Sequence, residues 1–163
     1  MSEPGLPFPS RLAQIDANPR VSRPDSDAGA AIVVLDTNVV LDLLVFDDPA
    51  CAPLLQALDA GSWRWLATAA MRDEFERVLG YPLISARLER QGRIAAAVLA
   101  AFDARVHVIA EVPARAPCIC SDPDDQIFID LAVAYGARLL SKDRAVLELR
   151  VRLAALGVAV AGG

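Results

Sequence analysis

Four acidic residues of the chain lie at or shortly after segments that have the pattern of short buried strands. They are far apart in the sequence and are Asp36, Glu74, Asp125 and Asp143. Carboxylate oxygens are the ligands that hard divalent cations such as Mg²⁺ and Mn²⁺ prefer. Such a cation lowers the pKa of a water molecule and stabilises the charge that develops during hydrolysis of a phosphodiester. If the four side chains converge, the sequence therefore predicts a metal-dependent hydrolytic site.

Each of these acids also has a purely structural interpretation. The segment Asp36-Thr37-Asn38 and the residue Asp143 have the residue types that cap helices. Asp122-Pro123-Asp124-Asp125 is typical of a helix start, with acids favoured by the helix dipole. Glu74 lies in a charged run that by itself indicates solvated surface. Singly these interpretations are favoured, but they leave unexplained why all four acids follow strands.

The segments that would position the acids alternate between strands and helices. Short apolar runs predict strands at 31–35, 65–67, 106–109, 137–141 and 158–160. Apolar periodicity, caps and prolines predict helices at 39–46, 49–59, 68–79, 84–102, 122–136 and 145–156. The alternation predicts an α/β fold, a three-layer α/β/α sandwich around a mainly parallel sheet of four to five strands. Sites in such sheets lie beyond the carboxyl ends of the strands, where the four acids fall.

Composition narrows the class of protein. The 163 residues are 55% hydrophobic and 23% charged, which is typical of a globular domain and excludes a disordered chain. Residues 1–29 hold five of the eleven prolines and are expected to form a flexible extension to a domain at 30–163. A net charge of −5 argues against a protein that coats nucleic acid by charge alone, but not against a metal-dependent enzyme. The absence of a signal-peptide pattern or a long apolar run predicts a cytoplasmic protein without a membrane contact.

Four segments of the sequence resemble the PIN domain, a family with a Mg²⁺-dependent ribonuclease fold. They are residues 32–39 with an Asp-Thr-Asn signature, 68–79, 122–128 and 136–143, and they occur in the order and spacing typical of the family. The resemblance implies that Asp36, Glu74, Asp125 and Asp143 are both the catalytic and the metal-binding residues, with Mg²⁺ or Mn²⁺ as cofactor. Asp125 takes the third place because it lies three residues before Phe128.

The sequence is most similar to the group of this family described as toxins of toxin–antitoxin systems. That similarity implies hydrolysis of single-stranded RNA, a cognate antitoxin as partner and a homodimer. It also implies auxiliary roles for Asn38, Asp124 and Ser141, the last in a position where the family usually has threonine. Arg72, Arg77 and Lys142 are candidates for RNA contacts, although pairing of the arginines with neighbouring acids is an equally good interpretation.

Two other functions remain open from the residues alone. An aspartyl-phosphate phosphatase or phosphoacceptor domain also uses an aspartate after a central strand, but it normally has a second acid two residues later, where this chain has Asn38. A non-catalytic binding module is the other alternative, in which an acidic pocket accepts a basic side chain of a protein partner.

Overall fold

The computed structural model describes residues 30–162 of the chain. The predicted extension at 1–29 therefore lies outside the described residues. Within them, five strands form one sheet: β1 (Ala31–Leu35), β2 (Trp63–Thr68), β3 (Val106–Ile109), β4 (Arg138–Leu140) and β5 (Val160–Ala161). No helix of this part of the chain has both the length and the apolar character needed to cross a membrane.

The sheet is parallel throughout and has the order β3-β2-β1-β4-β5. In the centre of the sheet, Val33 of β1 lies opposite Trp65 of β2 on one side and Arg138 of β4 on the other. Val33 and Val34 are both completely buried although their side chains point to opposite faces, so helices must cover both faces of β1. The predicted α/β fold with a parallel sheet is confirmed.

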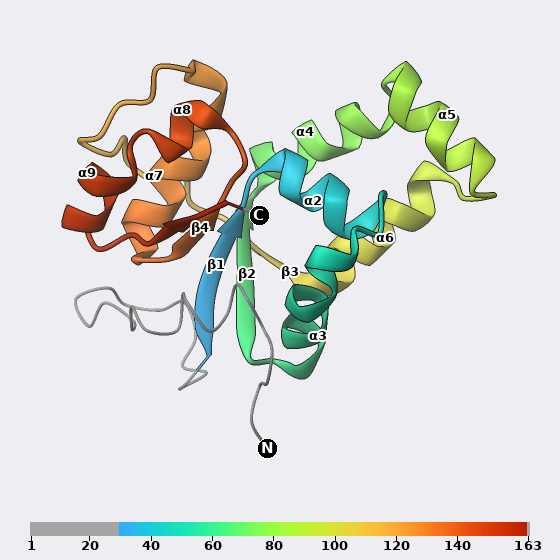
Figure 1. Ribbon diagram of the computed structural model, residues 1–163, viewed down its shortest axis with the longest axis horizontal. Helices are drawn as coiled ribbons and strands as arrows, with labels where there is room; N and C mark the ends of the chain where they lie inside the picture. The colour runs from blue at the N-terminus through green and yellow to red at the C-terminus, as the bar shows by residue number, and fades with distance from the viewer. Residues whose placement is uncertain (1–29, 163) are drawn as a thin grey trace.

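The two halves of the chain supply the two helical layers (Figure 1). One face of the sheet is covered from the first half by α2 (Thr37–Leu44), η1 (Pro49–Cys51), α3 (Ala52–Ala60), α4 (Ala69–Leu79) and α6 (Ala95–Arg105), and the same half contains α5 (Pro82–Arg90). The other face is covered from the second half by η2 (Pro123–Asp125), α7 (Gln126–Tyr135), α8 (Arg144–Leu147) and α9 (Arg150–Ala155). Right-handed crossovers require this division, because β2 and β4 lie on opposite sides of β1.

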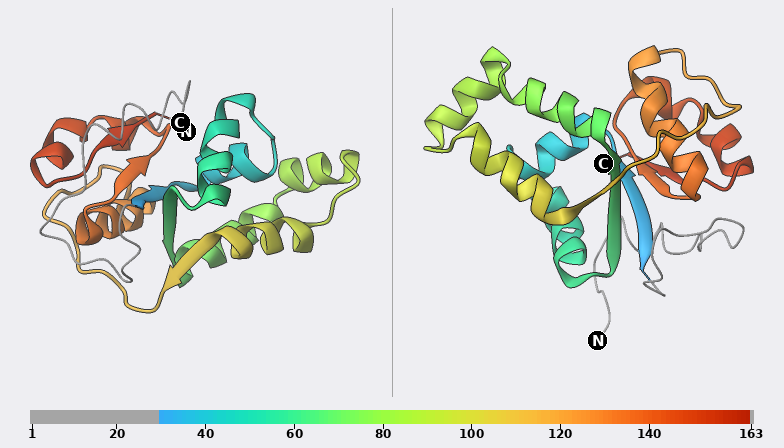
Figure 2. Two further views of the ribbon diagram at one scale, coloured as in Figure 1. Left: turned by 90° about the horizontal axis from the view of Figure 1, so that it is seen from below. Right: turned by 180° about the vertical axis from the view of Figure 1, so that it is seen from behind.

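Helices α4, α5 and α6 form an arm whose outer end, α5, lies far from the sheet (Figure 2). The segment 84–102, predicted to be helical, is helical over most of its length but is divided in two, because α5 ends at Arg90 and α6 begins at Ala95. Gly92 has a φ of +69°, a left-handed conformation that glycine adopts without strain, and it lets the chain reverse between the two helices.

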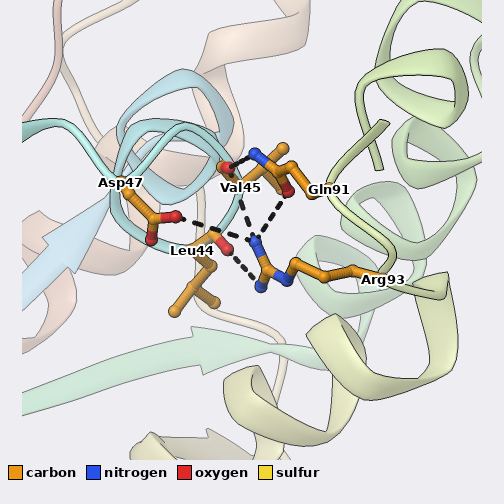
Figure 3. A network of polar contacts seen from close by, with 5 residues as sticks. All are labelled: Leu44, Val45, Asp47, Gln91 and Arg93. Atoms are coloured by element: carbon orange, nitrogen blue, oxygen red, sulfur yellow. Dashed lines mark hydrogen bonds and ion pairs between the residues drawn. The ribbon is translucent and has the colours of Figure 1, made fainter. Parts of the chain in front are cut away.

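The turn between α5 and α6 is bonded to the end of α2 (Figure 3). The guanidinium group of Arg93 donates to the carbonyl oxygen of Leu44 at 2.7 Å, and the amide of Gln91 donates to that of Val45 at 2.9 Å. Arg93 also lies 3.9 Å from the carboxylate of Asp47. Carbonyls at the end of a helix have no partner within the helix, so these bonds satisfy them and hold the arm against α2.

Candidate metal-binding active site

The carboxyl ends of β1 and β4 lie side by side at the centre of the sheet. The helices that follow these two strands run to opposite faces of the sheet, and parallel α/β sheets characteristically have a crevice for ligands at such a point. The backbone N–H of Asp36 donates to the carbonyl oxygen of Leu140 at 3.1 Å, so the two strand ends remain paired up to this point. The residues directly after β1 and β4 therefore lie close together at the carboxyl edge of the sheet.

Asp36 is fixed through both oxygens of its carboxylate. Oδ1 accepts a hydrogen bond of 3.0 Å from the N–H of Val39 and so caps the start of α2. Oδ2 accepts a hydrogen bond from the hydroxyl of Ser141, directly after β4. The side chain is buried, and burial raises the pKa of Asp36, while the bonds from Ser141 and Val39 act in the opposite direction.

The same serine also fixes the fourth predicted acid. The N–H of Asp143 donates to the hydroxyl oxygen of Ser141 at 3.0 Å, and Oδ1 of Asp143 accepts from the N–H of Ala145 at 2.9 Å to cap α8. Ser141 is completely buried. Its single hydroxyl therefore connects the acid after β1 with the acid after β4.

Asp125 meets Asp143 within the helical layer that the second half of the chain forms. It lies at the end of η2, directly before α7, and 9% of its surface is exposed. Carboxylate oxygens of Asp122, Asp125 and Asp143 all lie within 4.8 Å of one another. The pKa of Asp125 is raised from 3.8 to about 7, first by burial and then by the neighbouring Asp143, with smaller effects of Asp122 and Asp36. Three acids are thus gathered where two elements of the second half of the chain meet.

Glu74 reaches the crevice from α4. This helix starts directly after β2, where the hydroxyl of Thr68 accepts from the N–H of Met71 at 3.3 Å. The next residue, Phe75, is buried against Phe102, with the ring centroids 5.1 Å apart, and this packing fixes the rotation of the helix. Oε2 of Glu74 lies 3.4 Å from the hydroxyl of Thr37, the first residue of α2.

Three of the four predicted acids line one cavity of about 540 Å³. Asp36, Glu74 and Asp125 lie on its wall together with Thr37 and Asn38. The rest of the wall is largely apolar and consists of Leu41, Val78, Tyr81, Pro82, Leu83, Ile84 and Phe128. The cavity thus joins an acidic end at the sheet to an apolar side formed mainly by α4, α5 and the turn between them.

The other predicted site residues lie in different environments. Asn38 is exposed on the cavity wall, and Asp124 is exposed with its backbone N–H bonded to Asp122. Nε and Nη2 of Arg72 each donate to the carboxylate of Asp103 at 2.7 Å. Arg77 is exposed on α4. Asp103 raises the pKa of Arg72 by its hydrogen bonds.

Lys142, the third candidate for an RNA contact, forms an ion pair with Asp42 of α2. The hydrogen bond from this pair raises the pKa of Lys142. Because Lys142 lies between Ser141 and Asp143, the ion pair ties the loop after β4 to the helix that starts at Asp36.

The loop that leads to Asp122 is held by Gln126, a buried residue of α7. Its side-chain oxygen accepts from the N–H of Cys120 at 2.7 Å, and its nitrogen donates to the carbonyl of Cys118 at 3.0 Å. Asp130 accepts from the N–H of Ala116 at 2.8 Å and extends the attachment. One face of α7 therefore fixes the approach of the chain to the acidic group.

Sequence reasoning assigned Asp122 only a capping role. The carboxylate does cap η2, since Oδ1 accepts from the N–H of Asp124 at 3.0 Å, yet it also belongs to the group with Asp125 and Asp143. The signal in the sequence was the spacing Asp122-Pro123-Asp124-Asp125, because one helical turn brings residues three apart to the same side.

Comparison with known proteins identifies the class of this arrangement. A family model described as "PIN domain" matches residues 32–145. Among solved structures, the chain is similar to one from the crystal structure of VapBC2 from Rickettsia felis bound to a DNA fragment from their promoter. The TM-score is 0.56 at 14% sequence identity, over 80% of this chain and 98% of that chain. No curated protein sequence matches the chain.

Proposed function

This chain belongs to the PIN domain family, and we propose that it is a Mg²⁺- or Mn²⁺-dependent endoribonuclease that hydrolyses single-stranded RNA. The observation that carries the proposal is the convergence of acids from four separate elements. Asp36, Glu74 and Asp125 line one cavity, and Asp143 lies beside Asp125.

The chemistry of these residues fits a hard divalent cation. The acidic end of the cavity offers carboxylate oxygens, the ligand type that Mg²⁺ and Mn²⁺ prefer. Oδ2 of Asp125 is buried and accepts no hydrogen bond within residues 30–162, and an unsatisfied carboxylate oxygen of this kind is costly unless the group takes up a proton or a cation binds it. Asp36, Glu74, Asp125 and Asp143 are the residues that would hold the metal. The bound ion would supply an activated water and would stabilise negative charge on the phosphate.

The chain's own residues then have distinct tasks. Ser141 holds Asp36 and the backbone of Asp143 in fixed positions through one hydroxyl. Asp125 exchanges its proton near neutral pH, because its pKa is about 7, and its carboxylate becomes available as a ligand when that proton leaves. Burial of Asp36 excludes water from one side of the site and strengthens the electrostatic interactions there.

The apolar side of the cavity supports single-stranded RNA as the substrate. Tyr81, which is half exposed, and Phe128, which is largely buried, line the same cavity as Asp36, Glu74 and Asp125. An unpaired base can turn out of the strand and pack against such a surface, whereas a base within a duplex is held in its stack. The acids would then act on the phosphodiester next to the packed base.

We further propose that the protein is the toxin of a toxin–antitoxin pair. The fold similarity to a chain of VapBC2 supports this proposal, as does the similarity of the four motifs to the toxin group. A cytoplasmic protein with a cognate antitoxin and a homodimeric assembly is the corresponding expectation. Co-purification with the product of a neighbouring gene, together with the mass of the purified protein by light scattering, would test the partner and the assembly.

Cleavage of labelled single-stranded RNA tests the nuclease proposal directly. The wild-type protein should cleave with Mn²⁺ and lose this activity in EDTA. Asp36→Asn should be inactive yet folded, because the asparagine oxygen can still cap α2 while the negative charge is lost. Asp48→Asn is the matched control, since Asp48 also caps a helical segment but lies outside the cavity wall. Full cleavage by Asp36→Asn would refute the assignment, and absence of cleavage by the wild type would favour a binding module.

A further inference from the structure

The cavity beside the acids is bounded by the starts of two helices of the first half of the chain. One wall consists of residues from Asp36 to Leu41, at the start of α2, and another of residues from Tyr81 to Ile84, at the start of α5. The separation of α2 and α5 therefore decides how much room a ligand has next to the acids.

Helix α5 is only weakly held by packing. Of its nine residues, Ile84 and Leu88 are the buried ones. Leu83, on the cavity wall, is 84% exposed. A helix that buries so few side chains gains little from the core and needs other contacts to keep a fixed place against α2.

Such contacts are present where α2 ends (Figure 3). The guanidinium group of Arg93 donates to the carbonyl oxygen of Leu44 at 2.7 Å, and the amide of Gln91 donates to that of Val45 at 2.9 Å. Gln91 also accepts from the guanidinium of Arg93 at 3.0 Å, so the two side chains orient each other. Both acceptor residues are buried.

A third side chain joins the same two elements. The guanidinium of Arg87, within α5, lies over the ring of Phe46, 5.0 Å from its centroid. A cation over an aromatic face is attracted by the electrons of the ring. Arg87, Gln91 and Arg93 are together called the α5–α2 contact below.

The α5–α2 contact is close to the cavity walls along both helices. The N–H groups of Val45 and Phe46 both donate to the carbonyl oxygen of Leu41 at 2.9 Å, and Leu41 lines the cavity. On α5, Arg87 follows the cavity residue Ile84 by three positions, which is about one helical turn. Because a helix is rigid over one turn, the contact fixes the positions of both walls.

We propose that the α5–α2 contact sets the separation of the two cavity walls and thereby positions the RNA substrate. Arg93 and Gln91 are positioning residues, since they lie outside the cavity wall and act through the start of α5. The inference rests on the proposed ribonuclease function and adds to it residues that determine how the substrate fits. Without the contact, α5 moves away from α2 and an unpaired base loses one of the surfaces that it packs against, while the acidic end of the cavity stays intact.

The position of α5 is measured first, without RNA and without metal. Spin labels are attached at Asn38→Cys on α2 and Leu83→Cys on α5, both exposed residues of the cavity wall. The three natural cysteines are buried, so the introduced ones are labelled selectively. Electron paramagnetic resonance should give one narrow distance distribution. Adding Arg93→Ala should broaden it and shift it to longer distances, and an unchanged distribution would overturn the inference.

Cleavage of single-stranded RNA with Mn²⁺ gives the second readout, in chains without labels. Arg93→Ala should raise KM about tenfold and leave kcat within about twofold, because binding weakens while the acids are unaffected. Arg93→Lys keeps a cationic donor and should have a KM within about threefold of that of the wild type. A fall in kcat at unchanged KM would contradict a positioning role for the contact.

Val158→Ala separates positioning from a general loss of stability. Val158 is completely buried and lies between α9 and β5, in the other half of the chain. Its truncation leaves a cavity in the core and should lower Tm, but KM and the label distance should stay those of the wild type. Arg90→Ala, an exposed residue of α5, should change none of the three. If Val158→Ala raises KM as much as Arg93→Ala does, KM follows stability and the inference is wrong.

The inference and the nuclease proposal fail in distinguishable ways. A label distance that changes in Arg93→Ala, in a protein that cleaves no RNA, supports control of the cavity by the contact and contradicts the nuclease proposal. Equal label distances and equal KM in the wild type and Arg93→Ala, with cleavage lost in Asp36→Asn, disprove the inference and leave the nuclease proposal standing.

Discussion

The hydroxyl of Ser141 donates to the carboxylate of Asp36 across 105 residues of sequence. The same oxygen accepts from the backbone N–H of Asp143 at 3.0 Å. Because Asp36 follows β1 and Asp143 follows β4, this serine joins the two central strands at the point where the acids gather. Ser141 is completely buried, so water does not reach its hydroxyl.

Replacing this serine tests its role in positioning. Ser141→Ala removes the donor to Asp36 and should lower the free energy of unfolding by about 1–3 kcal/mol. The pKa of Asp36 should rise further, because the bond from Ser141 acts to lower it. We expect Mn²⁺ affinity to fall about 10–100-fold, as for other residues that orient metal ligands. Calorimetric titration with Mn²⁺ measures the change.

Ser141→Thr is the corresponding control, because it retains the hydroxyl. Its Mn²⁺ affinity should stay within a few-fold of that of the wild type. If Ser141→Ala binds Mn²⁺ as tightly as the wild type, the hydroxyl does not position the site.

The affinity for metal should depend on pH near neutrality. Asp125, whose pKa is about 7, must lose its proton before its carboxylate can bind a cation. Apparent Mn²⁺ affinity should therefore fall by about tenfold for each pH unit below 7 and level off above it. Titrations between pH 5.5 and about 8.5 measure this profile. An affinity that is flat from pH 5.5 to 7 would contradict the shifted pKa of Asp125.

The stability of the metal-free protein should change in the opposite sense. The folded-state pKa of Asp125 is raised from 3.8 to about 7, so between these values the folded chain binds more protons than the unfolded chain. The contribution of Asp125 to the free energy of unfolding is thus lost as pH rises through this window. Asp125→Asn should be more stable than the wild type at pH 8 in EDTA, and the difference should shrink towards pH 4. Urea denaturation at both pH values measures it, and an equal difference at both would be inconsistent with the shift.

The contact between the arm formed by α4, α5 and α6 and the end of α2 should contribute to the stability of the protein through Arg93. Arg93→Ala removes the charged donor to the buried carbonyl of Leu44 and should lower the free energy of unfolding by about 1–3 kcal/mol (Figure 3). Arg90→Ala, an exposed arginine at the end of α5, should change it by less than about 0.5 kcal/mol. Urea denaturation compares the two variants, and equal losses would show that the contact with α2 contributes no stability of its own.

Substitution of the two arginines of α4, Arg72 and Arg77, should have different effects on RNA binding. Arg77 is exposed, so Arg77→Ala should weaken RNA binding and reduce its salt dependence by about one unit of slope. The guanidinium group of Arg72 is held by Asp103, so Arg72→Ala should mainly loosen the packing of α4 on α6. Fluorescence titrations of labelled RNA at several salt concentrations distinguish them. A larger loss of binding in Arg72→Ala than in Arg77→Ala would reverse this assignment.

The sequence was sufficient to predict the parallel sheet and the position of Asp36 and Asp143 after two of its strands. The apolar run before Asp36 and the run before Ser141 have the pattern of strands buried on both faces, and a parallel sheet then requires their ends to meet. Convergence of distant acids followed from topology rather than from any local signal. That is why the placement of Asp36 and Asp143 could be predicted although each also reads as a helix cap.

Other features depended on contacts that the sequence does not show. The predicted helix over 84–102 was interrupted because Gly92 adopts a left-handed conformation and Arg93 bonds to the end of α2. The proximity of Asp122 to Asp125 and Asp143 was not predicted. A capping pattern accounts for one of its carboxylate oxygens and gives no information about the other. The bond of Arg72 to Asp103 joins helices 31 residues apart, and no local spacing indicates it.

Each of the three aspartates that cap a helical segment at the crevice uses Oδ1 for that bond: Asp36, Asp122 and Asp143. Rotation about these side-chain bonds is therefore restricted once the chain has folded, whether or not a cation is bound. Binding of a cation to these carboxylates would therefore cost less side-chain entropy, because the three hydrogen bonds already restrict their conformations in the folded chain. The same hydrogen bonds that start the three helical segments thus also orient the carboxylates towards a cation.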